Sequence, residues 1–484
     1  MDNKQAFETV LSEFMKLTQI PRPSHHEEKV SDYLYQWGLD HHLQVRRDRL
    51  NEVFIDKPAS KGFEHAPTVL FQAHMDMVCV AEEGVPFNPT EDPIKVINDG
   101  VKLTADGTSL GADDGIGVAL ALYILQDDSL QHGPIRALFT TNEEDGMDSM
   151  NMEPEYLEGD FLINLDWETL GSLCNSCAGG DFFEYSRKCE WEAPAEGKEA
   201  LSISFKDLQG GHSGVGINLG RANALVSIAT ALSMLKQHGI PFQIAALSGG
   251  QAKNAIPAAA TAQIVISASD KEKATATLDN YYHQFMEAYQ NVEPDVKWQV
   301  IPENAVPAQV LSVAMSEDLI DLMAVVPNNV HTMSPFVDGL VESSSNLGIA
   351  KLDHETIRFT VFARSSVEYQ ATQLGTICAA LASRFGFDFS SEGHVPGWAV
   401  NPNSKLVPIC CQAYKEITGQ DMVVEPVHAG VECGAFAQKN PHLDMIAIGP
   451  TLIGVHTPDE VCQLKDVEVT TELLVAVLKK LASV

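Results

Sequence analysis

The sequence predicts an α/β protein in which one layered domain is interrupted by a second one. Apolar runs typical of strands alternate with helical patterns in the first third of the 484 residues, and this rhythm resumes near the end. Such alternation is typical of a sheet covered by helices. Polar stretches with Pro and Gly at 185–198 and 390–396 fit joints between domains. We therefore expect residues 1–190 and 395–484 to form one discontinuous domain around an inserted α/β domain, 191–394.

The spacing of apolar residues and the residues typical of helix starts predict the individual helices and strands. Apolar residues at helical spacing predict a first helix over 7–15, and Ser24 followed by Glu27 matches a capping box that would start a second helix. The inserted domain repeats a strand and helix pattern and is large enough for two α/β units. The other expected helices cover about 115–126, 221–236, 271–289, 371–385 and 467–481, and the expected strands 68–71, 135–140, 161–165, 201–205, 261–266, 357–362 and 445–448.

The composition excludes several classes of partner. With 32 Lys and Arg against 66 Asp and Glu, the formal net charge is −34, which disfavours binding to nucleic acid or anionic lipid. The longest apolar stretch, 115–125, is shorter than the about 20 residues of a membrane-spanning helix, and the N-terminal residues lack the features of a signal peptide. Nine cysteines form no secreted disulfide framework. We expect a cytoplasmic protein without nucleic-acid or membrane partners.

Metal-ligand types follow the predicted strands and precede a predicted helix, at the edge where open α/β sheets place their sites. His74 and Asp76 point the same way because strand residues alternate, and a zinc-bound imidazole commonly donates its second N–H to a carboxylate. Each cluster alone has an ordinary explanation, such as a helix cap, a solvated loop or a packed histidine, but together they indicate a metal site. The clusters are His74-x-Asp76, Asp113-Asp114, Glu143-Glu144, Asp166 and His456.

In order and context, these clusters resemble the dizinc metallopeptidase family that includes carnosinases, aminoacylases, glutamate carboxypeptidases and desuccinylases. Segments 72–78, 111–115 and 428–434 are most similar to the family's bacterial dipeptidases that release a C-terminal histidine. The resemblance implies a zinc-peptidase-like mixed β-sheet flanked by helices, with the insert as a lid domain. It also implies a cis peptide bond between Asp113 and Asp114.

The resemblance implies a role for each residue. His74 and Asp166 would hold one zinc ion, Glu144 and His456 the other, and Asp113 would bridge them. Manganese or cobalt could occupy the same ligands. Asp76 would orient His74, and Glu143 would be the general base toward a metal-bound water. In the lid, His212 would stabilise the oxyanion. The implied substrate-binding residues are Asn254, Arg364, as a clamp for the substrate carboxylate, and Gly434.

The expected function is a dizinc dipeptidase acting on unblocked dipeptides, preferentially Xaa-His such as β-alanyl-histidine. A dizinc amidohydrolase for N-acyl amino acids, with the same metals and base, is the nearest alternative. A non-enzymatic metal- or peptide-binding relative is less favoured, because such a protein has no use for Glu143 beside the metals. The resemblance also favours a homodimer. Cys174 and Cys177 have a spacing found in redox and zinc sites, but no second pair accompanies them.

Overall fold

The structure is a computed structural model that describes residues 2–484. The chain folds into two compact units. Unit 1 comprises the chain up to Cys177 together with Gly397–Val427 and Val431–Val484. Unit 2 comprises Ala178–Pro396 and His428–Gly430. The two units are described separately below.

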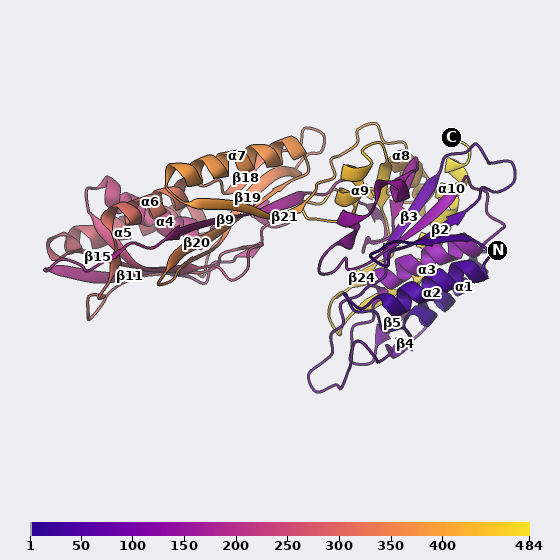
Figure 1. Cartoon of the computed structure of the whole chain (residues 1–484), viewed down its shortest axis with the longest axis horizontal. Coiled ribbons are helices and arrows are strands. Elements are labelled where there is room, and N and C mark those ends of the chain that lie inside the picture. Colours follow the sequence, from indigo (N-terminus) through magenta and orange to yellow (C-terminus); the bar gives the residue numbers. More distant parts are fainter. Residues whose placement is uncertain (1) are drawn as a thin grey trace. The chain divides into compact units, whose positions relative to one another are not determined.

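Unit 1 is built on a six-stranded mixed sheet with the strand order β1-β2-β6-β3-β7-β23 (Figure 1). The four strands β6, β3, β7 and β23 are parallel to one another, whereas β2 pairs antiparallel with both β1 and β6. The parallel part carries the expected strands of the first domain, and β23 joins it from the far end of the sequence. The strands are β1 (Gln44–Arg47), β2 (Val53–Lys57), β3 (Val69–His74), β6 (Ile135–Thr140), β7 (Phe161–Asn164) and β23 (Asp444–Ala447).

Both faces of this sheet are buried, because successive strand residues pack into different cores. Val53 and Ile55 join the core beneath five helices, whereas Phe54 between them joins the core on the other face, with α9 (Cys433–Lys439) and two short 3-10 helices. In α3, every residue from Ala112 to Leu125 is buried, which explains the apolar run of residues 115–125 after Asp113 and Asp114. The five helices are α1 (Asn3–Leu17), α2 (Glu28–Asp40), α3 (Ala112–Gln126), α8 (Leu406–Thr418) and α10 (Leu464–Leu481).

The expected capping box at the start of α2 is wrong. The N-cap residue is Glu27, and no side chain caps the helix. The hydroxyl of Ser24 donates instead to Asp76 at 2.7 Å, and the Glu27 carboxylate accepts from the backbone N–H groups of His25 and Asn142. Hydrogen bonds to Asp76 and Asn142, both far along the chain, therefore use these two side chains in place of a cap on the helix.

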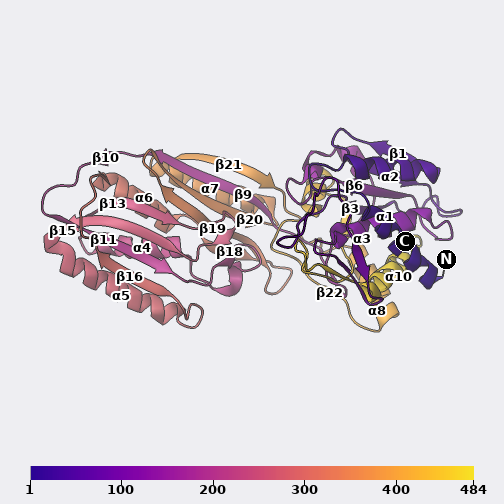
Figure 2. The same ribbon diagram turned by 90° about the horizontal axis from the view of Figure 1, so that it is seen from below.

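Unit 2 is one continuous antiparallel sheet of nine strands with helices α4 to α7 on one face (Figures 1 and 2). The order is β16-β11-β15-β13-β19-β20-β9-β21, and β18 pairs with β19 beside this path. The strands are β9 (Gly179–Lys188), β11 (Lys198–Lys206), β13 (Phe242–Gly249), β15 (Ala260–Ser267), β16 (Lys297–Pro302), β18 (Asn329–Met333), β19 (Val341–Leu352), β20 (Thr356–Ser365) and β21 (Asp388–Val395). The helices are α4 (Ala224–Gln237), α5 (Lys271–Tyr289), α6 (Val313–Val325) and α7 (Glu368–Arg384).

Short strands complete both units. In unit 1, β4, β5, β24 and β25 form a four-stranded sheet, and β8 pairs with β22. In unit 2, β10 pairs with β17 and β12 with β14. These strands are β4 (Val96–Asn98), β5 (Lys102–Ala105), β8 (Ser172–Leu173), β10 (Trp191–Glu192), β12 (Gly211–His212), β14 (Ala255–Ile256), β17 (Val310–Leu311), β22 (Val423–Val424), β24 (Leu452–Ile453) and β25 (Val461–Gln463). Among residues 2–484, no helix has the length and apolar character needed to cross a bilayer.

Candidate metal centre

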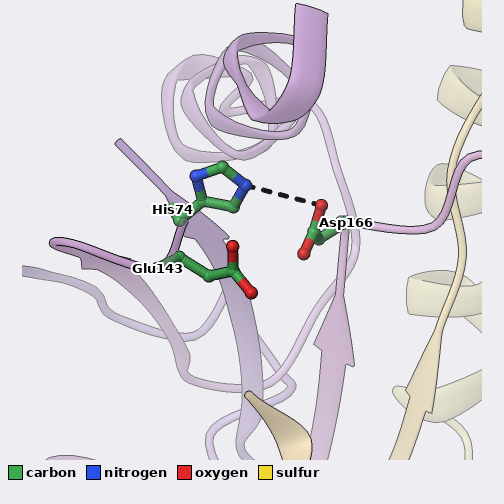
Figure 3. A group of neighbouring side chains, drawn as sticks. All are labelled: His74, Glu143 and Asp166. Carbon is green, nitrogen blue, oxygen red and sulfur yellow. Dashed lines mark ion pairs between the residues drawn. The ribbon is translucent and has the colours of Figure 1, made fainter. Parts of the chain in front are cut away.

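Neighbouring parallel strands of unit 1 bring the first group of ligand atoms together. β3 and β6 are in register with His74 opposite Thr140, so the residues that follow these ends share one edge with Asp166, which follows β7. Figure 3 shows His74, Glu143 and Asp166 turned toward the same space, with His74 Nε2 3.6 Å from Asp166 Oδ1. One ligand atom from each of these three residues lies within 4.8 Å of the other two.

Asp113 links this group to a second one. Its Oδ1 lies 3.0 Å from His74 Nε2, and its Oδ2 lies 3.0 Å from His456 Nε2. His456 Nε2 is also 2.9 Å from Glu144 Oε2. Ligand atoms of His74, Asp113 and Glu144 again lie within 4.8 Å of one another. The carboxylate of Asp113 therefore stands between the two histidines, with one oxygen toward each.

Asp76 lies behind His74 and organises the neighbouring loop. Its Oδ1 is 3.4 Å from His74 Nδ1, and its carboxylate accepts hydrogen bonds from the backbone N–H groups of Glu143 and Glu144 at 3.1 and 3.3 Å. Burial alone would raise the pKa of Asp76, but the adjacent His74 ring and hydrogen bonds from Ser24 and Glu143 lower it to about 2. Asp76 therefore remains ionised and fixes both the imidazole and the start of the Glu143-Glu144 loop.

Several carboxyl groups of the centre lie close together and have little access to water. Burial raises the pKa of Asp166 to about 8 and raises that of Glu143 well above its ordinary value. Hydrogen bonds to Asp113 and Glu144 raise the pKa of His456 to about 10. In addition, Glu144 Oε1 is buried and has no hydrogen-bond partner among the described residues. Divalent cations would neutralise this negative charge, and mixed imidazole and carboxylate ligands suit zinc, manganese or cobalt.

Two buried side chains that the sequence analysis missed hold the Asp113 segment in place. The carboxylate of Glu460 accepts four backbone N–H groups, from residues 110–113, at 2.7 to 3.3 Å. Arg22 donates to the carbonyl oxygens of Met75 and Asp76 at 2.9 and 2.8 Å and to that of Gly111. Gly111 has φ 70°, and a Cβ there would lie 2.8 Å from Arg22 Nη2, so both conformation and space require glycine. The peptide bond between Asp113 and Asp114 is cis, as expected.

Glu432 is a third residue that the sequence analysis missed, and it takes part in a hydrogen-bond network that connects three strands. It is fully buried, and one of its oxygens accepts from Gln72 Nε2 and from Thr140 Oγ1 at 2.5 and 2.9 Å. Gln72 in turn accepts from the Asn164 amide at 2.5 Å, and Asn164 Oδ1 accepts from the backbone N–H of Asp166 at 3.2 Å. Because Gln72, Thr140 and Asn164 lie on β3, β6 and β7, this network fixes three strands relative to one another. No local motif signals it, since its members are far apart in the sequence.

Three of the residues assigned by resemblance to the lid lie in unit 2. His212 is exposed, and its Nδ1 accepts from the backbone N–H groups of Gly214 and Val215, both at 3.3 Å. Partial burial and the nearby Arg364 cation lower the pKa of His212, which favours the neutral ring, and its Nε2 lies 3.4 Å from the Nη2 donor of Arg364. Asn254 is exposed, and its carbonyl accepts from the N–H of Ser213 at 2.9 Å.

Gly434, the third substrate-binding residue expected from the resemblance, lies in unit 1, in the first turn of α9. Its N–H already donates to the carbonyl of Val431 at 3.0 Å. A contact from this N–H to a substrate carboxylate would therefore require the bond to open.

The fold and the centre define a class of protein, and comparison with known proteins agrees. The chain belongs to peptidase family M20/M25/M40, which residues 70–480 match. The protein is therefore a hydrolase of peptide bonds, and the predicted fold class, a mixed α/β fold of the zinc-peptidase type, is confirmed.

Two relatives match nearly the whole chain. It is 33% identical over 470 residues to the cytosol non-specific dipeptidase of Escherichia coli (strain K12), covering 97% of this chain and 96% of the relative. The crystal structure of aminoacylhistidine dipeptidase from Vibrio alginolyticus matches with a TM-score of 0.94 at 33% identity, covering 98% of this chain and 96% of that one. The aminopeptidase PepT of Bacillus cereus ATCC 10987 matches with a TM-score of 0.57 and 16% identity over 98% of this chain and 99% of its own, which shows the shared fold.

Proposed function

We propose that the protein is a cytoplasmic dizinc metallodipeptidase that cleaves unblocked dipeptides and prefers a C-terminal histidine, as in β-alanyl-histidine. The observation that carries the proposal is the Asp113 carboxylate between His74 and His456, with the half-buried Glu143 beside the first group. The names of the two whole-length relatives support the dipeptidase activity, and that of the Vibrio relative supports the histidine preference.

The residues present fit a pair of divalent cations. His74 and Asp166 would hold one and Glu144 and His456 the other, and Asp113, which lies between the two histidines, would serve both. Bound zinc supplies Lewis acidity, which polarises the scissile carbonyl and makes water more acidic. Manganese or cobalt would supply the same chemistry through these ligands.

Glu143 is the proton carrier in this proposal. Its backbone N–H is fixed by Asp76, and its carboxyl turns toward His74 and Asp166. It accepts the proton of the attacking water as general base and then donates it to the leaving amine. Asp76 acts as a positioning residue, because it holds the ring of His74 and the Glu143 loop at once.

Unit 2 supplies groups for the substrate. In this proposal the imidazole of His212 donates a ring N–H to the oxyanion that forms when the carbonyl is attacked. Arg364 can bind the free carboxylate of the dipeptide through two parallel hydrogen bonds, and Asn254 adds a polar contact. We also propose a homodimer. Unit 1 is the catalytic domain and unit 2 the lid in this proposal; compared with the expected bounds of 1–190 with 395–484 and 191–394, unit 2 begins at Ala178 and also includes His428–Gly430.

Hydrolysis by metal-stripped protein before and after two equivalents of zinc tests the proposal. The substrates are β-alanyl-histidine, alanyl-histidine, alanyl-alanine and N-acetyl-histidine. We expect zinc to restore cleavage of the free dipeptides, with the histidine compounds preferred. Cleavage of N-acetyl-histidine alone would replace the proposal with an amidohydrolase, and zinc binding without any cleavage would leave a binding protein.

A further inference from the structure

The segment that joins α1 to α2 runs beside the residues that follow β3. Pro23 forms a parallel β-bridge with Met77. The next residue, Ser24, donates its hydroxyl to Asp76 Oδ2 at 2.7 Å. The carboxylate of Asp76 also accepts two backbone N–H groups of the loop 142–145, which follows β6. Asp76 therefore connects this segment of the chain to the loop.

Glu27 makes a second, direct connection between the same segment and the loop. Its side chain is buried, and Oε1 accepts from the backbone N–H groups of His25 and Asn142, both at 3.0 Å. Asn142 is also buried and has φ 54°, a left-handed conformation that asparagine adopts more often than most residue types. Glu27 therefore fixes the residue that directly precedes Glu143.

A third connection, between His25 and Asp145, lies at the surface. His25 Nε2 is 2.7 Å from Asp145 Oδ2, but the two side chains are 58% and 72% exposed. Exposed ion pairs contribute little, because water and salt screen them and two mobile side chains must be ordered. The hydrogen bonds of Ser24 and Glu27, which are shielded from water, are therefore the ones that hold the loop.

The loop carries two of the groups that the proposed chemistry needs. Glu143 turns toward the first group of ligand atoms (Figure 3), and Glu144 Oε2 lies 2.9 Å from His456 Nε2. Because Asn142 directly precedes both glutamates, a displacement of the loop would move both carboxyl groups at once. Catalytic and metal-binding groups must be held within about 0.5 Å of their productive positions, and residues outside the ligand set provide this support.

We propose that Ser24 and Glu27 are positioning residues for the metal centre and its general base. Ser24 acts through Asp76, and Glu27 acts through the backbone of Asn142. Together they hold the loop 142–145 so that its two glutamates can transfer protons and bind metal. This inference rests on the proposed function for the roles of those glutamates, whereas the hold on the loop is a property of the chain itself.

The first test is amide hydrogen exchange of the metal-free protein, followed by mass spectrometry. In Glu27→Ala we expect the amides of residues 142–147 to exchange about tenfold faster than in the wild type, because the loop opens more readily. Unchanged exchange in α10 would verify that unit 1 is folded. Glu27→Gln keeps an acceptor oxygen and should recover slow exchange. Glu28→Ala is the matched control, since it removes the same charge from an exposed neighbouring position.

The second test measures zinc affinity, by competition with a chelator, and hydrolysis of alanyl-histidine by zinc-loaded protein. In Ser24→Ala and Glu27→Ala we expect zinc affinity and kcat each to fall about tenfold, with KM nearly unchanged. Ser24→Thr, which keeps a hydroxyl, and Glu27→Gln should recover most of both losses. A purely structural role would lower Tm and leave the kcat of the folded protein as it is.

Equal exchange of residues 142–147 in Glu27→Ala, Glu28→Ala and the wild type would overturn the inference, whatever the protein cleaves. Faster exchange with wild-type zinc affinity and kcat would overturn it too, since the hold on the loop would then have no consequence for the centre. If the wild type cleaves no dipeptide, the proposed function fails. Faster exchange together with weaker zinc binding would in that case still support the positioning of the metal centre by Glu27.

Discussion

Replacing Glu460 by glutamine should show how strongly one buried carboxylate supports the metal centre. Glu460 is 2% exposed, and each of its oxygens accepts two backbone N–H groups, Oε2 from residues 110 and 111 and Oε1 from residues 112 and 113. In Glu460→Gln, the amide NH₂ must face two of these donors in either orientation. An unsatisfied buried donor costs about 1–3 kcal/mol, so we expect unit 1 to lose about 2–6 kcal/mol.

The same substitution should weaken metal binding, because the N–H of Asp113 is one of the four donors. Loss of a group that orients a metal ligand typically reduces affinity about 10–100-fold. Urea denaturation of zinc-free protein measures the first effect, and competition with a chelator measures the second. Asp459→Asn is the matched control, since it removes the same charge from an exposed neighbouring position. Glu460→Gln with wild-type stability and zinc affinity would refute the reasoning.

Further outcomes are expected. Glu143→Gln should bind zinc as the wild type does but lose at least about 10²-fold in kcat, and an unaltered kcat would exclude it as general base. Zinc removal should abolish cleavage and lower Tm, because the ions bind only the folded chain; equal Tm values would contradict this. Glu432→Ala should weaken zinc binding about tenfold and Glu432→Gln less, since Gln keeps an acceptor oxygen; equal affinities would exclude a positioning role. Burial, with Asp48 nearby, raises the pKa of Glu52 to about 10, so the folded chain keeps a proton that the unfolded chain releases above about pH 4.5. The stability that Glu52 confers therefore falls as the pH rises from about 4.5 to about 10. The stability of Glu52→Gln relative to the wild type should increase between pH 6 and 9. A difference in urea midpoints that stays constant over this range would disprove this prediction.

Local patterns were sufficient to predict the principal elements and the grouping of site residues. The expected helix at 271–289 is α5, and the expected strand at 135–140 is β6. The ends of parallel strands share one edge, so His74 and Asp166 were expected to be neighbours, and their ion-pair distance is 3.6 Å. The bridging position of Asp113 came from the family resemblance rather than from the residues themselves.

The supporting residues could not be predicted, because their contacts join distant parts of the chain. Glu460 binds backbone groups about 350 positions earlier, and Glu432 binds Gln72 360 positions away. A glutamate that accepts N–H groups leaves no periodicity or motif in the sequence. The capping box failed for a similar reason, since Ser24 satisfies Asp76, 52 residues away, instead of the helix end.

The discontinuity of unit 1 means that the predicted metal ligands are made at widely separated times during synthesis. β23 completes the parallel sheet beside β7, and both His456 and Glu460 lie within the last 29 residues of the 484. During synthesis, which adds about 5–20 residues each second from the N-terminus, Asp113 is made long before its partners. Ribosome-bound chains that end before residue 456 therefore carry an incomplete centre. We therefore expect the complete candidate centre to bind metal only after residue 456 has been made.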